Sequence, residues 1–282
     1  MKRLVTIQDI SCIGKCSLTA ALPIISAMGI ETAIIPTAVL STHTAFDRFT
    51  FRDLTDEIKP IAEHWKEQNF KFDAIYTGYL GSVKQADIVS EFIDSFRTDD
   101  NIVFIDPVMG DNGRLYKGFD MDFVKQMSVL CGKADVITPN MTEACLLLGM
   151  DYSDCGYDKN HIRKILTELC GLGCKSAVLT GVSFDKDSLG VMGYNGETGE
   201  FFSYFNEKVP YMCHGTGDIF ASTCIGAMVR GIPLEKSAEL AADYTAECIK
   251  ATEEDDNPNW YGVNFECKIP YLIEKINTEY GI

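Results

Sequence analysis

The sequence predicts an α/β protein with a mostly parallel central sheet, helices on both of its faces and an antiparallel edge. Short apolar or β-branched runs alternate with longer amphipathic stretches along most of the 282 residues. Such alternation is typical of parallel sheets, in which each strand returns through a crossover helix. Late in the chain, two apolar runs flank Asn195-Gly196-Glu197-Thr198-Gly199, which predicts a hairpin and thus the antiparallel edge. Because no linker, repeat or low-complexity segment interrupts the pattern, we expect one domain over residues 1–282.

The individual elements follow from the spacing of apolar residues. Short buried or alternating runs predict strands, and a period near 3.6 predicts helices. Gly29 and Gly149 end two of the helices, Gly78 ends a strand, and Asp106-Pro107 closes another. We expect strands at residues 4–7, 32–39, 74–77, 102–105, 136–138, 176–180, 191–194 and 201–205. We expect helices at residues 17–28, 58–68, 84–96, 120–131, 142–148, 159–171, 219–228, 234–252 and 268–280.

Composition and charge exclude several classes of partner. With 25 Lys and Arg against 41 Asp and Glu, the formal net charge is −16. A surface of this sign repels nucleic acid and anionic membranes, so we expect neither as a partner. No run of 18 apolar residues is present, and the first residues turn polar too soon for a signal peptide, which predicts a cytoplasmic protein. Eleven cysteines without a Cys-x-x-Cys pair favour free thiols over disulfides or a metal site.

The most informative motif is Gly215-Thr216-Gly217-Asp218, which leads into the apolar run 219–228. A glycine-rich turn at a helix N-terminus presents several N–H groups to one point, where the helix dipole adds positive potential, and this suits a phosphate. An aspartate there would repel an anion unless its carboxylate had its own task, such as accepting the proton of a hydroxyl that attacks phosphorus. For this segment alone, a simple helix cap with glycines for the turn remains the alternative.

Polar residues and glycines also gather just after the predicted strands, where open parallel sheets bind ligands. These segments are residues 9–14, 41–44, 77–82, 106–111, 138–143 and 180–181. Three carboxylates among them, Asp106, Asp111 and Glu143, could hold a magnesium ion directly or through water. Each also has a structural alternative. The aspartates could start turns, and Glu143 could be an acid in the first turn of a helix, where the helix dipole favours a negative charge. Together they favour phosphoryl transfer, which needs a metal, donors for the phosphates and an oriented hydroxyl.

Three motifs, in this order, resemble the ribokinase-like superfamily of small-molecule kinases in its vitamin-kinase branch. They are Asp106-Pro107-Val108-Met109-Gly110-Asp111, Thr138-Pro139-Asn140-Met141-Thr142-Glu143 and Gly215-Thr216-Gly217-Asp218. Ser41-Thr42-His43-Thr44 and Thr77-Gly78-Tyr79-Leu80-Gly81-Ser82 are similar to segments of the pyridoxal/pyridoxamine kinase family. The resemblance runs from residue 4 to about residue 250. It implies a ribokinase-like fold and an ATP-dependent kinase that phosphorylates the 5′-hydroxymethyl group of pyridoxal, pyridoxine or pyridoxamine in vitamin B6 salvage.

The same resemblance implies a role for each matching residue. Asp218 would accept the hydroxyl proton, while the N–H groups of Gly215, Thr216 and Gly217 stabilise the developing charge. The positions implied for ATP are Asp111, Tyr116, Asn140, Glu143 and Thr180, and those implied for Mg²⁺ are Asp106 and Glu143. The positions implied for the B6 ring are Ser11, His43, Thr44 and Tyr79. The resemblance also implies a homodimer, and it leaves open whether a monovalent cation such as K⁺ is needed.

Two departures from the family pattern keep a second function open. His214 stands directly before the motif, where hydroxymethylpyrimidine kinases also carry histidine, although these enzymes usually have cysteine in place of Asp218. The first loop, residues 8–14, also lacks the Ser-His start common in B6 kinases. The alternative is therefore a hydroxymethylpyrimidine/phosphomethylpyrimidine kinase of thiamine synthesis. Its phosphorylated substrate would need a cationic pocket near the first strand, for which Arg3 and Lys15 are the nearby candidates.

Two further functions are disfavoured by particular residues. A sugar or nucleoside kinase would have little use for Tyr79 and His43, which suit a site that stacks on a flat ring. A non-catalytic nucleotide-binding or regulatory protein would be expected to lack the base or the metal carboxylates. Because Asp218, Asp106 and Glu143 are all present, an active kinase is the better expectation.

Overall fold

A computed structural model describes residues 1–153, 155–211 and 213–281. The strands are β1 (Arg3–Ser11), β2 (Glu31–Leu40), β3 (Phe51–Asp53), β4 (Ala74–Thr77), β5 (Ile102–Ile105), β6 (Gly110–Asp111), β7 (Arg114–Leu115), β8 (Val136–Ile137), β9 (Ser176–Val182), β10 (Ser188–Asn195) and β11 (Glu200–Glu207). Apart from the small β6–β7 hairpin, these strands form one sheet in the order β11-β10-β9-β8-β5-β4-β1-β2-β3. Its pairs from β2 to β9 are parallel.

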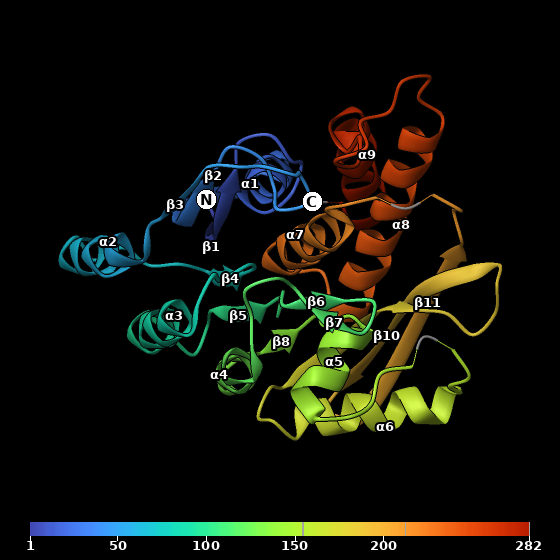
Figure 1. The fold of residues 1–282 in the computed structure, drawn as a ribbon, viewed down its shortest axis with the longest axis horizontal. Coiled ribbons are helices and arrows are strands. Elements are labelled where there is room, and N and C mark those ends of the chain that lie inside the picture. The colour runs from blue at the N-terminus through green and yellow to red at the C-terminus, as the bar shows by residue number, and fades with distance from the viewer. Residues whose placement is uncertain (154, 212, 282) are drawn as a thin grey trace.

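The helices cover both faces of this sheet (Figure 1). They are α1 (Leu18–Ala27), α2 (Thr55–Glu67), α3 (Val83–Phe96), α4 (Met121–Cys131), α5 (Met141–Leu148), α6 (Lys159–Cys170), α7 (Thr216–Val229), α8 (Leu234–Glu253) and α9 (Ile269–Tyr280), with a short 3₁₀ turn at Glu266–Lys268. Helices α2 to α6 pack in one apolar cluster on one face, and α1 with α7, α8 and α9 packs in a second cluster on the other. Within the described residues, no helix is long and apolar enough to cross a membrane.

The predicted α/β class is confirmed, with one difference at the edges of the sheet. The strands β9, β10 and β11 form the expected antiparallel edge. A second antiparallel pair, β2 with β3, closes the opposite edge and was not predicted. Strand β3 and the β6–β7 hairpin have only two or three residues per strand. Runs this short carry no period, so the sequence pattern could not predict them.

Helix α7 lies between its neighbours and is buried almost all round. Ten of its residues are buried, from Ile219 to Val229, and it packs against both α1 and α8. A helix that is apolar on every side must sit in the interior. Packing on α1 and α8 therefore fixes the position of its N-terminus. The helix begins at Thr216, three residues before the predicted run 219–228, so that Asp218 belongs to its first turn.

The early start of α7 is caused by Gly215, which caps the helix in the left-handed conformation with φ of 82°. A β-carbon at this position would lie 2.3 Å from the carbonyl oxygen of Lys15. Gly217, two residues on, has open space where its β-carbon would be and no positive φ. The two glycines of the motif therefore have different reasons to be present: only Gly215 is required by the backbone.

We expect Gly215→Ala to lower the free energy of unfolding by about 1–3 kcal/mol, because the substitution adds a strained φ and a clash with the Lys15 carbonyl. The matched control, Gly217→Ala, should leave stability unchanged or raise it by up to about 1 kcal/mol, since alanine is the better helix former. Urea unfolding of the two variants and the wild type makes the comparison. Equal stability of the two variants would contradict this account of the turn.

Candidate active site

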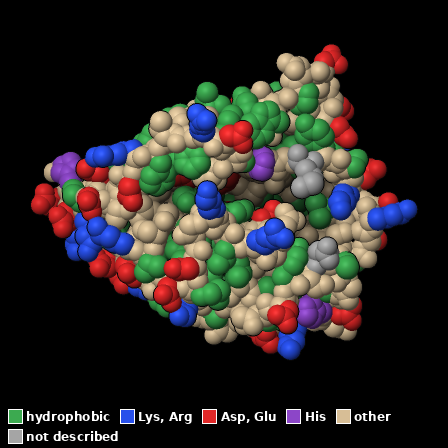
Figure 2. Space-filling view, in the orientation of Figure 1, with side chains coloured by type: hydrophobic (Ala, Val, Ile, Leu, Met, Phe, Trp, Pro, Cys, Tyr) green, Lys and Arg blue, Asp and Glu red, His purple; other side chains and the backbone are tan. Residues whose placement is uncertain are grey.

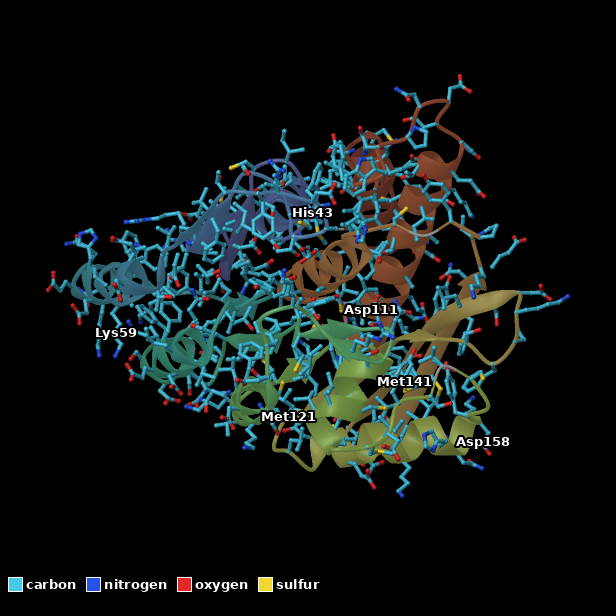
Figure 3. The ribbon with its side chains drawn as sticks, viewed as in Figure 1. His43, Lys59, Asp111, Met121, Met141 and Asp158 are labelled. Atoms are coloured by element: carbon cyan, nitrogen blue, oxygen red, sulfur yellow. The ribbon has the colours of Figure 1, made fainter. Side chains whose placement is uncertain are left out.

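The predicted site segments meet at the carboxyl ends of the parallel strands. The strands β1, β2, β4, β5 and β8 all end on this side, so the segments that follow them begin there. The N-terminus of α7 lies on the same side. Figure 2 shows that this face of the molecule is hollowed near its middle, with acidic side chains and a histidine beside the hollow. His43, after β2, and Asp111, in β6, approach the central region from different sides (Figure 3). The convergence expected from the sequence is therefore present in the fold.

Asp218 is half-buried in the first turn of α7. Burial, with a smaller contribution from the negative charge of Asp9, raises the pKa of its carboxyl group to about 7, against a hydrogen bond from the Ser17 backbone that lowers it. A carboxylate with a pKa near 7 accepts protons more readily than an ordinary aspartate. Asp218 therefore has the properties of a general base at neutral pH.

Backbone N–H groups accompany this base. The first internal hydrogen bond of α7 runs from the Ile219 N–H to the Gly215 carbonyl, at 3.1 Å. The N–H groups of Thr216 and Gly217 precede that bond and so lack a partner within the helix. They lie at the positive end of the helix dipole, which favours an anion or a developing negative charge. The motif thus brings a proton acceptor and an anion site to one helix end.

Asp106 and Glu143 form a second acidic pair. Asp106 is 6% exposed, and among the described residues the hydroxyl of Thr138 donates a hydrogen bond to its carboxyl group at 3.4 Å. Burial raises its pKa well above the usual range, and repulsion from Glu143 and Asp218 adds to the rise. Burial raises the pKa of Glu143 to about 8, against hydrogen bonds from the backbone. Buried acids with this much mutual repulsion suit a cation.

The geometry allows a magnesium ion that is held in part by the substrate. Among the described residues, no group of three or more His, Cys, Asp and Glu side chains is arranged to hold a metal by itself. Magnesium commonly uses one or two carboxylates together with waters and phosphate oxygens. Asp106, with its oxygens almost free of partners, fits such a role. Glu143 fits it less directly, because its two oxygens accept the N–H groups of Met109 at 3.1 Å and Asn140 at 2.9 Å.

Asn140 and Glu143 have a structural role that the sequence motif did not reveal. They form a reciprocal capping box at the start of α5, in which the Asn140 amide oxygen accepts the Glu143 N–H at 3.0 Å. The Asn140 amide nitrogen donates to the Gly110 carbonyl at 2.9 Å. Thr180 lies in the same region. It forms an isolated parallel β-bridge with Asn140, and its backbone N–H donates a hydrogen bond to the Pro139 carbonyl. These contacts fix the loop after β5 to the helix after β8.

The β6–β7 hairpin places two more predicted residues. Asp111 is exposed and accepts hydrogen bonds from the backbone and side chain of Asn112. Tyr116 follows the hairpin and is 42% exposed. Burial of its hydroxyl group raises the pKa, and Glu143, Asp111, Asp218 and Asp106 contribute further. The charges of these four acids therefore act on the Tyr116 hydroxyl, and its place beside the phosphates stays a prediction.

The residues predicted for the acceptor ring differ in their surroundings. Tyr79 is half-buried with its ring 5.5 Å from that of Phe119, which makes an aromatic wall. Ser11 is buried and donates to Asp9. His43 is engaged at both ring nitrogens, through the Tyr261 carbonyl at 2.8 Å and the Ala45 N–H at 3.2 Å, so only its ring remains for a ligand. Thr44 is exposed.

Two residues at the site, Asp9 and Ser17, were not singled out from the sequence, and Lys15 was named only as a candidate for binding a phosphorylated substrate. Asp9, in β1, is a buried carboxylate whose charge influences both Asp218 and Tyr79. Ser17 bonds Asp218 through its backbone. Lys15 places its carbonyl against Gly215, and its ammonium group contacts Asn264 at 2.9 Å and Glu266 at 3.0 Å. The polarity of residues 9–14 after the first predicted strand was the available signal for Asp9, but it did not distinguish Asp9 from its neighbours, and Ser17 lies beyond that segment.

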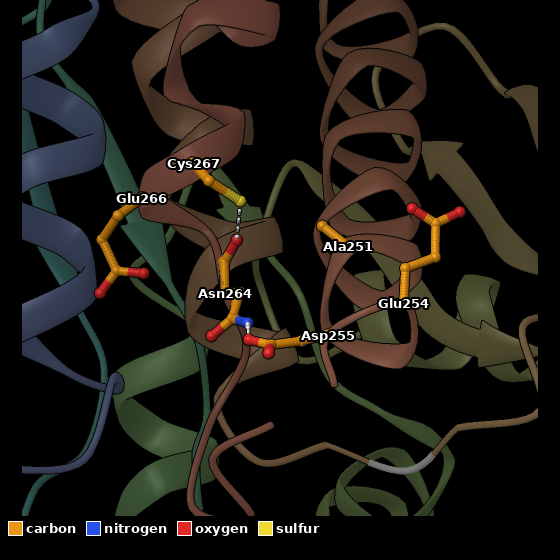
Figure 4. A pocket seen from close by; sticks show the side chains of 6 residues that line it. All are labelled: Ala251, Glu254, Asp255, Asn264, Glu266 and Cys267. Atoms are coloured by element: carbon orange, nitrogen blue, oxygen red, sulfur yellow. Dashed lines mark hydrogen bonds between the residues drawn. The ribbon is translucent and has the colours of Figure 1, made fainter. Parts of the chain in front are cut away.

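A separate pocket of about 490 Å³ lies between the end of α8 and the 3₁₀ turn (Figure 4). Its lining residues are Ala251, Glu254, Asp255, Asn264, Glu266 and Cys267. None of these belongs to the predicted site. The pocket touches the site only indirectly, through the contacts of Asn264 and Glu266 with Lys15. We therefore do not assign the catalytic centre to this pocket.

Known proteins match this chain over most of its length. A model of the phosphomethylpyrimidine kinase family matches residues 17–259. A structure from Bacteroides thetaiotaomicron VPI-5482, provisionally named a phosphomethylpyrimidine kinase and crystallised with pyridoxal, is 39% identical with a TM-score of 0.92, covering 96% of this chain and 95% of that one. Pyridoxal kinase from Lactobacillus plantarum is 30% identical with a TM-score of 0.90, covering 99% of each chain. The curated pyridoxal kinase of Arabidopsis thaliana is 26% identical over 261 residues, which is 90% of this chain and 83% of that protein.

These matches agree with the architecture and with the motifs at the sheet edge. The Lactobacillus plantarum structure shares the mostly parallel sheet from end to end. The family match includes the two acidic motifs and the Gly215–Asp218 turn. The chain therefore belongs to the phosphomethylpyrimidine kinase family and has the ribokinase-like fold that its motifs predict.

Proposed function

We propose that this protein is an ATP-dependent kinase that phosphorylates the 5′-hydroxymethyl group of pyridoxal, pyridoxine or pyridoxamine. The observation that carries the proposal is Asp218: a base whose pKa burial raises to about 7, placed in the first turn of a buried helix. After β4, at the same edge of the sheet, the rings of Tyr79 and Phe119 form an aromatic wall that suits a flat ring. A relative 39% identical to this chain has been crystallised with pyridoxal.

The residues of the site account for the transfer of a proton and the control of charge. Asp218 accepts the proton of the 5′-hydroxyl group as its oxygen attacks phosphorus. The N–H groups of Gly215, Thr216 and Gly217 stabilise negative charge on the phosphoryl group in the transition state. Asp111, Tyr116, Asn140, Glu143 and Thr180 are proposed to line the ATP side. Asp106 and Glu143 would hold a magnesium ion, which would neutralise negative charge on the phosphates.

The cations nearest the first strand argue against a phosphorylated acceptor. Lys15 is bound to Glu266 and Asn264 and is largely buried. Arg3 pairs with Glu31 at the amino end of β1, at the opposite end of the strand from the site. Neither of the two candidates is free to hold a phosphate in the acceptor pocket. Hydroxymethylpyrimidine without a phosphate remains the second candidate substrate, favoured by His214 and by the family's name.

Several further properties belong to the same proposal. We expect Mg²⁺ as the metal, a homodimer as the assembly and the cytoplasm as the compartment, while a need for K⁺ is left to measurement. The exposed side chains of Phe49 and Phe51 support a partner surface beside edge strand β3, because they are 40% and 50% accessible. The net charge of −16 is consistent with a protein that binds neither nucleic acid nor anionic membrane.

ADP release with Mg²⁺-ATP against five acceptors tests the proposed substrate. We expect turnover with at least one of pyridoxal, pyridoxamine and pyridoxine, weak turnover with hydroxymethylpyrimidine, and none with ribose, because the wall at Tyr79 suits an aromatic ring. Turnover mainly with hydroxymethylpyrimidine would overturn the leading proposal in favour of the second one.

Asp218→Asn should reduce turnover by about 10²-fold or more while ATP binding survives, since the variant loses the general base but keeps its shape. The matched control is Asp122→Asn, which changes an exposed first-turn carboxylate of α4. Steady-state ADP release and calorimetric ATP binding give the two readouts. Near-normal turnover of Asp218→Asn would mean that another group accepts the proton.

The acidic pair predicts how Mg²⁺ changes stability with pH. Asp and Glu side chains in the unfolded chain titrate near pH 4, whereas burial raises the pKa of Glu143 to about 8 and holds the pKa of Asp106 well above its usual range. Stability contributed by these two groups is therefore complete below about pH 4 and is lost as pH rises through about 8. Mg²⁺ favours the ionised forms, so it should raise the melting temperature more at pH 8 than at pH 6. Asp106→Asn should remove most of that difference. An equal effect of Mg²⁺ on the wild-type melting temperature at both pH values would contradict the assignment of the metal to Asp106 and Glu143.

A further inference from the structure

Asp9 is a buried carboxylate that the proposed mechanism does not use. Its side chain is 4% exposed and lies near the carboxyl end of β1, within the site. The Ser11 hydroxyl donates to its Oδ2 atom at 3.0 Å, and the Ser17 hydroxyl forms a second side-chain hydrogen bond. Among the ion pairs of the described residues, none includes Asp9. Two hydroxyl groups therefore hold a carboxylate that has no countercharge among the described residues.

The groups around Asp9 cannot supply that charge. The titratable groups that interact with it electrostatically are His43, Tyr79, Cys16 and Asp218. Burial lowers the pKa of His43, whose two ring nitrogens already have partners within the protein. The nearest lysine in sequence, Lys15, is paired with Glu266. The other three groups are neutral or negative.

A buried carboxylate without a cation is costly, because its charge has lost water and gained no partner. Burial accordingly raises the pKa of Asp9. Such a group becomes favourable when a ligand brings a positive charge to it. The vitamers of the proposed function carry one at the ring nitrogen when it is protonated, and pyridoxamine carries a second on its 4-aminomethyl arm.

We propose that Asp9 determines acceptor specificity by binding a protonated nitrogen of the vitamer with its carboxylate, while the Ser11 and Ser17 hydroxyls hold that carboxylate in place. This inference rests on the proposed function, since it concerns the same acceptor pocket. The position of Asp9 supports it: its charge influences both Tyr79 in the aromatic wall and the base Asp218. A ring that stacks beside Tyr79 with its hydroxymethyl group at Asp218 would also lie near Asp9.

The competing explanation is that Asp9 only supports the turn through Ser11 and Ser17. The two explanations predict opposite effects of Asp9→Asn. If Asp9 binds a cation, the variant removes a costly charge from the free protein, so its melting temperature should be unchanged or higher while vitamer binding weakens. If Asp9 is only structural, the variant should lower the melting temperature and leave vitamer affinity as it was.

The experiment measures dissociation constants of pyridoxine, pyridoxal and pyridoxamine by calorimetry, with melting temperatures, for the wild type, Asp9→Asn and the control Asp73→Asn. Asp73 is a hydrogen-bonded carboxylate at the opposite end of the sheet, paired with Lys2. We expect Asp9→Asn to weaken binding of a vitamer that uses the contact by roughly 30-fold, and Asp73→Asn to leave all three affinities unchanged. An equal loss for all three vitamers would assign the contact to the ring nitrogen, and a loss confined to pyridoxamine would assign it to the amine.

Wild-type affinities of Asp9→Asn for all three vitamers would overturn the inference about Asp9. Turnover of no vitamer by the wild-type protein would instead overturn the proposed function, so the two failures are distinguishable. If Asp9→Asn does not fold, Asp9→Ser gives the same test with a smaller uncharged side chain. Unchanged affinities of that variant would likewise contradict the inference.

Discussion

Buried negative charge is the constraint on which the rest of this site depends. Asp9, Asp106, Glu143 and Asp218 gather at the carboxyl edge of the sheet, and burial raises the pKa of each. None of them takes part in an ion pair among the described residues. The fold holds these acids with hydroxyl and backbone N–H groups instead of lysine or arginine, which leaves their charge available to ligands. A metal ion, a hydroxyl proton and a cationic vitamer are each a partner that such acids favour.

A single turn connects the acceptor side of the site to the base. Between β1 and α1, Lys15 and Ser17 adopt positive φ values of 50° and 48°, which non-glycine residues adopt only when the surroundings enforce them. The Lys15 carbonyl lies against Gly215, and the Ser17 backbone bonds Asp218. The ammonium group of Lys15 in turn contacts Asn264 and Glu266. Residues far apart in sequence thus fix the geometry of the base.

The sequence predicted the fold well where a strand is a buried apolar run. The buried strands at 74–77 and 102–105 have the predicted bounds, because a short apolar run between polar ends leaves little choice. Strand β3 and the β6–β7 hairpin escaped prediction, since their pairing depends on neighbours that only the folded chain provides. The start of α7 was placed too late because the backbone conformation of Gly215, and not the apolar pattern, begins that helix.

The site was predicted through its motifs, and its remaining residues became visible only in the folded chain. Asp218, Asp106 and Glu143 stand in recognisable segments, so their chemistry could be inferred from residue type and spacing. The capping box of Asn140 and Glu143 was hidden in the same motif, because a nucleotide contact and a helix cap favour the same residues. Asp9 lacked any motif of its own. The burial of Asp9, and the lack of a cation beside it among the described residues, arise only when the chain folds.

A structure of the protein with ADP and pyridoxamine bound is the most direct test of the account. We predict that the 5′-hydroxyl oxygen lies within hydrogen-bond distance of the Asp218 carboxylate, with the ring beside Tyr79 and a nitrogen of the vitamer at Asp9. A vitamer whose hydroxymethyl group points away from Asp218, or one bound in the pocket at Asn264 and Glu266, would contradict the central claim that the buried acids at the sheet edge form the acceptor site.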